Sequence, residues 1–261
     1  MRTALTIAGS DSSAGAGIQA DLKTFAAHGV YGTSAITAIT AQNTLGVIEA
    51  EALSADLVTA QIEAVMADIG AHAAKTGMLA NAAIVEAVAA AIEDLEIPLV
   101  VVDPVMVATS GHTLLDDEAV GAMKAELLSQ AFVVTPNVPE AEVLAQREIH
   151  TEDDLRDAAR RIHALGARAV LIKGGHFPSA DVIDLLYDGH RFTEFRAERV
   201  ESTSTHGTGC TFAAALTAHL AIGRPLEEAI PLAQQFVAGA IRNAPGLGKG
   251  HGPLGHFWSL Y

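Results

Sequence analysis

The sequence predicts an α/β fold in which helices cover both faces of a mostly parallel central sheet. Short runs of β-branched and other apolar residues alternate along the chain with longer, alanine-rich amphipathic segments. Several of these runs, such as PLVVVD and ARAVLI, are continuously apolar over three or more residues, as in strands that are buried on both faces of a parallel sheet. We expect a single domain over residues 1–261, because the chain contains no proline- or serine-rich linker, no low-complexity tract and no internal repeat.

The predicted strands recur along the chain with helical segments between them. The first, TALTIA at 3–8, is typical: a β-branched and apolar run that ends where glycine and serine begin. We expect further strands at 33–40, 73–78, 98–103, 131–137 and 167–173. The stretch VIDLLYDGHRFTEF contains two strand-like runs around Asp188 and Gly189, and this dipeptide favours the tight turn of a β-hairpin.

Helices are predicted between the strands and at the end of the chain. The apolar residues of these segments recur with the spacing of one helix face. We expect helices near 15–29, 55–69, 81–95, 117–129, 139–145, 152–165, 207–222 and 226–242. Because strands and helices alternate, the strands are expected to lie parallel in one sheet.

Composition and charge argue against several classes of protein. The formal net charge is −15, and such a surface would repel the phosphates of nucleic acid, although a small phosphate ligand responds to the local field. No apolar run approaches the ~18 residues of a membrane span. The N-terminal MRTALTIAGSDSSAGAG reaches glycine and serine too soon for a secretory signal, and the single cysteine allows no internal disulfide. We expect a cytoplasmic protein with no nucleic-acid or membrane partner.

Polar residues and glycines follow the predicted strands at their carboxyl ends. Asp103 ends VVVD, Asn137 ends VVTPN and Lys173 ends VLIK, while Gly9 and Asp11 follow the first strand. In an open parallel sheet, ligands bind beyond the carboxyl ends of the strands. One such residue alone would show only that loops are polar, but four strand ends with this mixture predict a binding crevice.

The stretch HGTGCTFAAAL predicts a glycine turn that leads into a helix. Gly207, Thr208 and Gly209 leave backbone N–H groups uncovered, and the first N–H groups of a helix have no partner within it. Together with the helix dipole they attract an anion, typically a phosphate. Cys210 begins this helix, so we expect its thiol to have a lowered pKa. The alternatives are an ordinary capped loop and a cysteine that serves as a small buried apolar residue.

Several motifs together resemble those of a known family. AGSDSSAGAGIQADLKTF, TAITAQNT, KTGML, VVDPVMVATSG, TPNVPEAE, IKGGH and HGTGCTFAAAL occur in this order. The combination resembles the bacterial hydroxymethylpyrimidine/phosphomethylpyrimidine kinases of thiamin biosynthesis, which are ribokinase-like. The resemblance implies a three-layer α/β/α fold with a small β flap, a homodimer, and ATP with Mg²⁺ as cofactors. It also implies two successive phosphorylations of an aminopyrimidine, first at its hydroxymethyl group and then at the resulting monophosphate.

The resemblance assigns roles to residues of the predicted crevice. The implied catalytic residues are Gly207, Thr208, Gly209, Cys210 and Lys173, and the implied Mg²⁺ ligands are Asp103, Glu140 and Asn137. The glycine turn resembles an anion hole for the transferring phosphoryl group, and Cys210 resembles the base for the substrate hydroxyl. Lys173 would neutralise phosphate charge, and hard oxygen ligands suit Mg²⁺ held through water.

Gln42 resembles the residue that reads the pyrimidine. One side-chain amide can donate to a ring nitrogen and accept from the neighbouring amino group. The further substrate-binding residues that the resemblance implies are Gly9, Asp21, Met78 and Val105. Segment 33–40 is expected to form part of a flap that excludes water.

Other interpretations of these residues stay open. Taken alone, Gln42 could turn outward at the end of its strand, Met78 and Val105 could belong to the core, and Asp21 could lie in solvent. Two alternative functions also stay open. One is a pyridoxal/pyridoxine kinase, whose substrate lacks the amino group that Gln42 would read. The other is a non-catalytic nucleotide-binding protein on the same fold.

Overall fold

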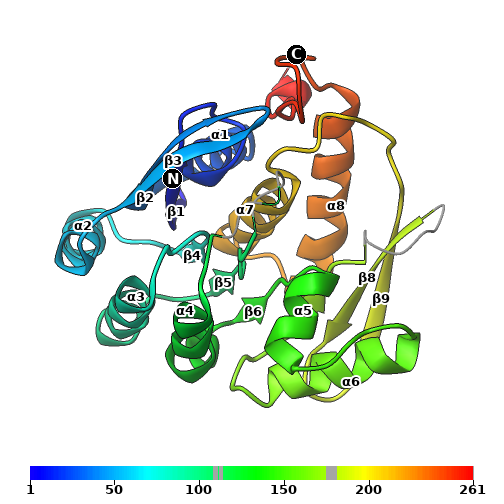
Figure 1. Cartoon of the computed structure of the whole chain (residues 1–261), viewed down its shortest axis with the longest axis horizontal. Helices are drawn as coiled ribbons and strands as arrows, with labels where there is room; N and C mark the ends of the chain where they lie inside the picture. Colours follow the sequence, from blue (N-terminus) through cyan, green and yellow to red (C-terminus); the bar gives the residue numbers. More distant parts are fainter. Residues whose placement is uncertain (108–110, 112–113, 175–180, 261) are drawn as a thin grey trace.

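The fold is built on a nine-stranded sheet (Figure 1), seen in a computed structural model that describes residues 1–107, 111, 114–174 and 181–260. The order across the sheet is β3-β2-β1-β4-β5-β6-β7-β8-β9. The strands are β1 (Thr3–Asp11), β2 (Tyr31–Asn43), β3 (Gly46–Ala52), β4 (Ala73–Thr76), β5 (Val100–Val102), β6 (Val133–Val134), β7 (Val170–Ile172), β8 (Asp181–Tyr187) and β9 (Phe192–Glu198). Neighbouring strands from β2 to β7 run parallel, whereas the pairs β2–β3, β7–β8 and β8–β9 are antiparallel.

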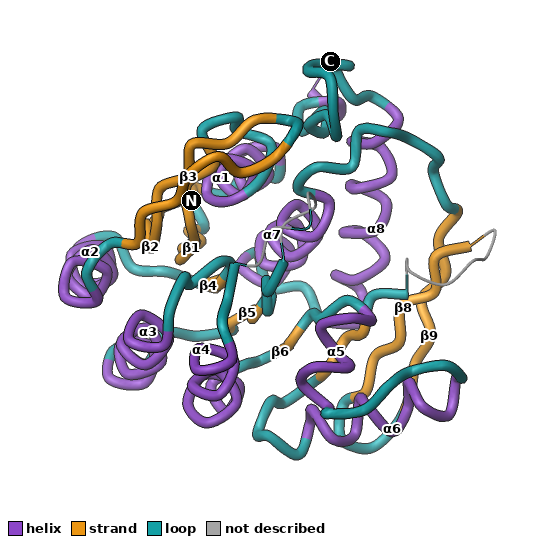
Figure 2. The backbone as a smooth tube through the Cα atoms, viewed as in Figure 1, coloured by secondary structure: helices purple, strands orange, loops and turns teal. Residues whose placement is uncertain are grey.

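Helices cover both faces of this sheet (Figures 1 and 2). One face carries α1 (Gly17–Ala27), α7 (Thr208–Ala221) and α8 (Leu226–Arg242), whose buried residues form one apolar core. The other face carries α2 (Ala55–Asp68), α3 (Ala82–Asp94), α4 (Asp117–Ala122), α5 (Val138–Ala145) and α6 (Glu152–His163), whose buried residues form a second core. The predicted three-layer α/β/α architecture is therefore confirmed.

The strands supply both cores, because successive side chains of a strand point to opposite faces of the sheet. In β5, Val100 and Val102 join the core of α2–α6, while Val101 joins the core of α1, α7 and α8. Leu171 and Ile172 of β7 divide between the two cores in the same way. Burial on both faces explains why these strands appear in the sequence as uninterrupted apolar runs.

The hairpin predicted around Asp188 and Gly189 is present as β8 and β9. Its strands pair up to Tyr187 and Phe192. Asp188 Oδ1 accepts hydrogen bonds from the backbone N–H groups of His190 and Arg191, both at 2.8 Å, which stabilises the turn. The helix expected at 117–129 differs from its prediction. It is α-helical only over α4 and continues as a π-helical turn (Met123–Leu127) and a 3-10 turn (Leu128–Gln130).

The sequence pattern does not predict β3. Its sequence GVIEAEA is mostly exposed, so no apolar periodicity marks it as a strand. β3 pairs with the second half of β2, from Ala38 to Asn43. Residues 38–52 therefore form a β flap at the edge of the sheet. Of the segment expected to form part of it, 33–40, residues 38–40 pair with β3, whereas 33–36 pair only with β1. Among the described residues, no helix is long and apolar enough to cross a membrane.

Candidate active site

A cavity of about 870 Å³ lies at the carboxyl ends of the parallel strands, beside the start of α7. All but one of the residues that the resemblance implies for the site line this cavity. They are Gly9, Gln42, Met78, Asp103, Val105, Asn137, Glu140, Lys173, Gly207, Thr208, Gly209 and Cys210. The exception is Asp21. The crevice predicted from the strand ends is therefore present, and it brings the predicted residues together.

The glycine turn before α7 packs tightly against the loop between β1 and α1. Gly207 adopts a left-handed backbone conformation with φ of 82°, and a Cβ atom there would lie 1.9 Å from the carbonyl oxygen of Gly15. Glycine is therefore required at this position. α7 has no side-chain cap at its N-terminus, and its first turn lines the cavity. Thr208 N–H donates to the carbonyl oxygen of Thr205 at 3.2 Å, so among the described residues the N–H groups of Gly209 and Cys210 are the ones available to an anion. The loop Gly207–Cys210, for which an anion was predicted, is called the anion loop below.

Asp103 and Lys173 form an ion pair in the cavity. Lys173 Nζ lies 2.9 Å from Asp103 Oδ1, which also accepts a hydrogen bond from Thr135 Oγ1 at 3.3 Å. Asp103 Oδ2 is buried and has no hydrogen-bond partner among the described residues. A Cβ atom at Gly209 would lie 3.9 Å from this oxygen and 3.5 Å from Lys173 Nζ. Burial opposes the charge of Lys173, but Asp103 and Glu140 outweigh it and raise the pKa of the lysine.

Asn137 and Glu140 cap the first turn of α5 reciprocally. Asn137 Oδ1 accepts the N–H of Glu140 at 2.9 Å, and Glu140 Oε2 accepts the N–H of Asn137 at 2.8 Å. Burial raises the pKa of Glu140 to about 7, with Lys173 opposing this shift and Asp103 adding to it. The structure thus gives the Asn137 side chain a capping role, which leaves Asp103 and Glu140 as the two carboxylates of the implied ligand set.

Asp103 and Glu140 fit the magnesium ion that the resemblance implies. Asp103 Oδ2 is a buried oxygen without a partner, and Glu140 is a carboxyl whose ionisation is disfavoured by burial; a nearby cation would relieve both. The described residues contain no group of three or more His, Cys, Asp or Glu side chains that could hold a metal. Two carboxylates suit Mg²⁺ that keeps several waters and binds phosphate oxygens as well.

The pKa predicted for Cys210 is wrong for the free protein. The residue lies half-buried in the first turn of α7, as expected. Burial raises the pKa of its thiol to about 11. The positive charge of Lys75 and the N–H of Gly17 lower it, while the negative charges of Asp21 and Asp103 raise it further. At neutral pH the sulfur is therefore protonated before any ligand binds.

Asp21 does not line the cavity, nor does it lie in solvent. It is fully buried on α1, where it accepts hydrogen bonds from Thr6 Oγ1 at 2.7 Å and Lys75 Nζ at 2.9 Å. Lys75, at the end of β4, lines the cavity instead. Sequence reasoning missed Lys75, although a lysine within the apolar run at 73–78 is a signal that could have found it, because such a charge requires a buried partner.

The remaining substrate-pocket predictions are placed around the same cavity. Gln42 lies at the end of β2, half-buried, with Oε1 3.1 Å from Thr40 Oγ1. Gly9 lies opposite Met78, since a Cβ atom on Gly9 would be 3.4 Å from the methionine sulfur. Val105 follows Asp103 and also lines the cavity. The expectation that Gln42 faces the crevice rather than solvent therefore agrees with its position.

Asp11 and His206 form a pair that sequence reasoning missed. His206 Nε2 lies 2.8 Å from Asp11 Oδ2, and both side chains are buried at the cavity wall. Burial alone would raise the pKa of Asp11, but hydrogen bonds from His206, Ser13 and Ala16 outweigh it and lower the pKa to about 2. The pair joins the β1–α1 loop to the residue that precedes the anion loop. Its sequence signals are Asp11 after the first strand and the histidine immediately before Gly207, but nothing in the sequence pairs the two.

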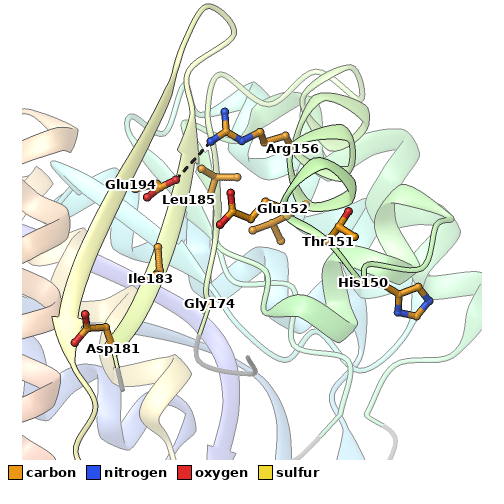
Figure 3. A pocket seen from close by; sticks show the side chains of 10 residues that line it. His150, Thr151, Glu152, Arg156, Gly174, Asp181, Ile183, Leu185 and Glu194 are labelled. Atoms are coloured by element: carbon orange, nitrogen blue, oxygen red, sulfur yellow. Dashed lines mark hydrogen bonds and ion pairs between the residues drawn. The ribbon is translucent and has the colours of Figure 1, made fainter. Parts of the chain in front are cut away.

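A second cavity, of about 320 Å³, lies between α6 and the β8–β9 hairpin (Figure 3). β8 separates the two cavities, because Ile183 lines the smaller one while Val182 and Asp184 line the larger one. At the smaller cavity, Arg156 Nη2 of α6 lies 3.5 Å from Glu194 Oε1 of β9 (Figure 3). None of the residues that the resemblance implies lines this cavity.

The fold and the larger cavity together define a ribokinase-like small-molecule kinase. An uncapped helix N-terminus, a lysine and two carboxylates at the carboxyl ends of parallel strands are the groups that phosphoryl transfer requires. A family model described as phosphomethylpyrimidine kinase matches residues 11–255. The chain belongs to this family.

Individual relatives agree with this assignment. The chain is 51% identical over 252 residues to a thiamine biosynthesis bifunctional protein of Geobacter sulfurreducens, covering 97% of this chain and 51% of that protein. It thus spans about half the length of this relative. It is 49% identical over 255 residues to a hydroxymethylpyrimidine/phosphomethylpyrimidine kinase of Bacillus subtilis, covering 97% and 94% of the two chains. An ADP complex of a Bacillus subtilis pyridoxal kinase has a TM-score of 0.90 and 41% identity, covering 98% of this chain and 97% of that one.

Proposed function

We propose that the protein phosphorylates 4-amino-5-hydroxymethyl-2-methylpyrimidine with ATP, first to the monophosphate and then to the diphosphate, in thiamin biosynthesis. One observation carries the proposal: the amide of Gln42 and the anion loop line the same cavity. An amide can read the amino group and ring nitrogen of this substrate, while the anion loop suits a phosphoryl group. Relatives that the chain matches over nearly their whole length are named as kinases of this pyrimidine.

Each step would use the residues of the cavity in the same way. The N–H groups of the anion loop and the charge of Lys173 stabilise the oxygens of the transferring phosphoryl group. Asp103 and Glu140 would hold Mg²⁺, which neutralises phosphate charge when it is bound. The acceptor oxygen attacks the γ-phosphorus, the bond to ADP breaks, and ADP leaves. Asn137 contributes by holding the first turn of α5, and therefore Glu140, in place.

The two acceptors differ in whether they carry a proton. In the first step the hydroxymethyl group loses its proton as its oxygen attacks, and Cys210 is the proposed base. The thiol can accept that proton only as a thiolate, and Lys75 is the group whose charge favours the thiolate. In the second step the acceptor is a phosphate that is already ionised, so no base is needed.

The proposal is tested by ADP release with Mg-ATP and three acceptors in parallel: hydroxymethylpyrimidine, its monophosphate and pyridoxal. We expect turnover of the first two, with pyridoxal poor. Lys173→Met serves as the inactive control, because it removes the charge beside the anion loop. Absence of turnover with both pyrimidines would contradict the proposal and favour a non-catalytic nucleotide-binding protein.

A pyridoxal kinase is the second candidate function. The observation that favours it is the 41% identity to the Bacillus subtilis pyridoxal kinase, with a TM-score of 0.90. Turnover of pyridoxal alone would establish it and leave the phosphate-binding residues in the same roles. Gln42 favours the pyrimidine, because pyridoxal lacks the amino group that would donate a hydrogen bond to the amide oxygen.

We infer further that the protein is a homodimer in the cytoplasm. The side chains of Ile39, Leu45 and Ile48 on the flap are 53%, 66% and 75% exposed, and β3 forms one edge of the sheet. Apolar side chains gathered on an edge strand favour a covered surface. Light scattering would test this by reporting either the 27.0 kDa of one chain or twice that mass. The single free cysteine is compatible with a reducing compartment.

A further inference from the structure

The side chain of Gln42 is held at several points around its amide. Ser12 Oγ donates to the Gln42 carbonyl oxygen and accepts the Gln42 N–H, both at 2.8 Å, so the backbone is fixed. At the side chain, Oε1 lies 3.1 Å from Thr40 Oγ1, and Nε2 lies 3.3 Å from His206 Nε2. The position of the amide plane is therefore set. Which hydrogen-bonding groups the amide offers to a ligand depends on whether its oxygen or its nitrogen faces His206.

Asp11 determines which nitrogen of His206 carries a proton. Asp11 Oδ2 accepts the N–H groups of Gly15 and Ala16 at 3.0 and 2.8 Å, and it lies 2.8 Å from His206 Nε2. Hydrogen bonds outweigh burial at this carboxyl and lower its pKa to about 2, so it is ionised and only accepts. His206 Nε2 must therefore be the donor. This holds for the neutral ring and for the charged ring alike.

A donor at His206 Nε2 fixes the direction of the Gln42 amide. With Nε2 of Gln42 at 3.3 Å, two donors would face each other, whereas the amide oxygen at this place would accept. Rotating the amide by half a turn exchanges its oxygen and nitrogen without changing its shape. Gln42 Nε2 then donates to Thr40 Oγ1, and Thr40 Oγ1 donates to the carbonyl oxygen of Ser10 at 3.0 Å. Every polar group in this chain of contacts then has a partner.

The histidine ring itself has little freedom to move. A Cβ atom on Gly15 would lie 2.3 Å from His206 Cδ2, so the ring packs directly on the glycine backbone. The His206 N–H donates to the carbonyl oxygen of Gly252 at 3.1 Å, and the residue immediately precedes Gly207. The ring is therefore fixed beside the anion loop, with Nε2 2.8 Å from Asp11 Oδ2 and 3.3 Å from the end of the Gln42 amide.

We propose that His206 is a specificity-determining residue that, held by Asp11, fixes the Gln42 amide with Oε1 toward His206 and Nε2 toward Thr40. The inference rests on the proposed function. After these contacts the amide retains one N–H and one oxygen lone pair, which match the ring nitrogen and amino group of an aminopyrimidine. Reversing the amide would exchange the positions of its N–H and its oxygen. A planar substrate could then form the same two hydrogen bonds only with its ring turned over. Its hydroxymethyl group, next to the amino group on the ring, would then leave the anion loop.

Steady-state kinetics of two substitutions test this role. His206→Leu removes the donor, whereas His206→Gln keeps an N–H that can reach Asp11. We expect His206→Leu to raise KM for the pyrimidine about 10- to 100-fold, because two hydrogen bonds to the substrate are lost. We expect KM for ATP to change by less than about twofold, and His206→Gln to restore most of the loss. An equal rise in both KM values would show a merely structural role and overturn the proposal.

A double-mutant cycle shows whether His206 acts through Gln42. In a Gln42→Ala background, His206→Leu should raise KM for the pyrimidine by less than about threefold, because no amide remains to be oriented. The same 10- to 100-fold effect in that background would contradict the proposal.

The tautomer of His206 provides a readout that does not depend on turnover. Long-range ¹⁵N–¹H correlation spectra of the free protein distinguish Nε2–H from Nδ1–H, and the signal missing from His206→Gln identifies the residue. We expect Nε2–H. A ring protonated on Nδ1 alone would contradict the amide orientation, whatever the substrate. A wild-type protein with Nε2–H that does not turn over the pyrimidine would contradict the proposed function, and with it the role of His206 in specificity.

Discussion

Lys75 and Asp21 form an ion pair that is completely enclosed by the protein. Lys75 Nζ lies 2.9 Å from Asp21 Oδ2, and neither side chain is exposed. The pair connects β4 with α1, and Lys75 reaches the wall of the larger cavity. Burial disfavours the charge of both groups, yet Asp21 and other nearby negative groups raise the pKa of Lys75. The pair thus places a permanent positive charge near Cys210.

Substitution of Lys75 should reveal how much the ion pair contributes to the free energy of unfolding. Lys75→Met leaves Asp21 buried without its counter-charge, so we expect the free energy of unfolding to fall by about 3–5 kcal/mol. Urea denaturation measures this loss. The double substitution Lys75→Met with Asp21→Asn is the control and should recover part of the stability, because it buries no charge. A Lys75→Met protein as stable as the wild type would contradict this account.

Substitution of Cys210 should separate the two phosphorylation steps. We expect Cys210→Ala to slow phosphorylation of the hydroxymethyl compound by about 100- to 10,000-fold, the range of a general base, and to slow that of the monophosphate much less. The reason is that only the first acceptor must lose a proton. Single-turnover rates with each acceptor measure the difference. Equal losses in both steps would instead make Cys210 a positioning residue.

The raised pKa of Cys210 predicts a pH dependence for the first step alone. A thiol with a pKa of about 11 is mostly protonated at pH 7, and its thiolate fraction grows as the pH rises toward that value. The rate of the first step should therefore increase by up to about tenfold per pH unit between pH 7 and 10. The second step should stay flat from about pH 8 to 10, where Glu140, with a pKa of about 7, is already ionised. Cys210→Ser is the control, and a slope that persists in this variant would assign the titration to another group.

Asp103 is expected to be essential for both steps. Asp103→Asn removes the charge that pairs with Lys173 and the free carboxylate oxygen that would face Mg²⁺. We expect kcat to fall by about 100-fold or more with either acceptor, together with a higher Mg²⁺ requirement. Rates measured over a Mg²⁺ titration test this. Glu152→Gln, which changes an exposed carboxylate at the second cavity, should leave rates and Mg²⁺ requirement unchanged.

Acid should destabilise the protein through His219 of α7. This ring meets His28 of α1 edge-on, with centroids 4.8 Å apart, and its Nδ1 is buried without a partner among the described residues. Burial lowers the pKa of His219 to about 4, and His28 and Arg224 add to this, whereas the unperturbed value is 6.5. The unfolded chain therefore binds a proton that the folded chain excludes, and the contribution of His219 to stability declines as pH falls from 6.5 to 4.

His219→Leu isolates this contribution, because leucine has no proton to gain. Urea unfolding of both proteins should show the variant gaining stability relative to the wild type as pH falls from about 7 to about 4.5. A difference in unfolding free energy that is the same at every pH would show that His219 does not titrate in this window.

The parts of the fold that could be predicted from sequence are those whose burial leaves a pattern in the chain. Val100–Val102 are buried from both sides, so β5 appears as an uninterrupted apolar run. β3 has the opposite property: from Ile48 to Ala52 its residues are exposed, and its strand state depends on pairing with β2. Its position therefore could not be predicted from local pattern.

Which residues surround the candidate site could largely be predicted from sequence, but their pKa values could not. The strand ends and the glycine turn pointed to Asp103, Lys173 and the anion loop, whereas Gln42 was implied only by the family resemblance. The pKa of Cys210 depends instead on burial and on Asp21 and Asp103, which other elements bring to it. His206 is one of 11 histidines, and only the fold places it against Asp11, 195 residues away in the chain.

The contact between Gly207 and the carbonyl oxygen of Gly15 joins the anion loop to the loop that holds Gln42. No Cβ atom fits between these backbones, so a shift of the anion loop displaces the β1–α1 loop, whose Ser12 holds Gln42. Under the proposed function, a nucleotide that shifted the anion loop on binding would therefore also change the affinity for the pyrimidine. Thermodynamic linkage requires this effect to be reciprocal: the factor by which one ligand tightens or weakens the other is the same in both directions. Any such synergy between the two substrates would thus depend on the close packing of Gly207 against Gly15, which is already present in the free protein.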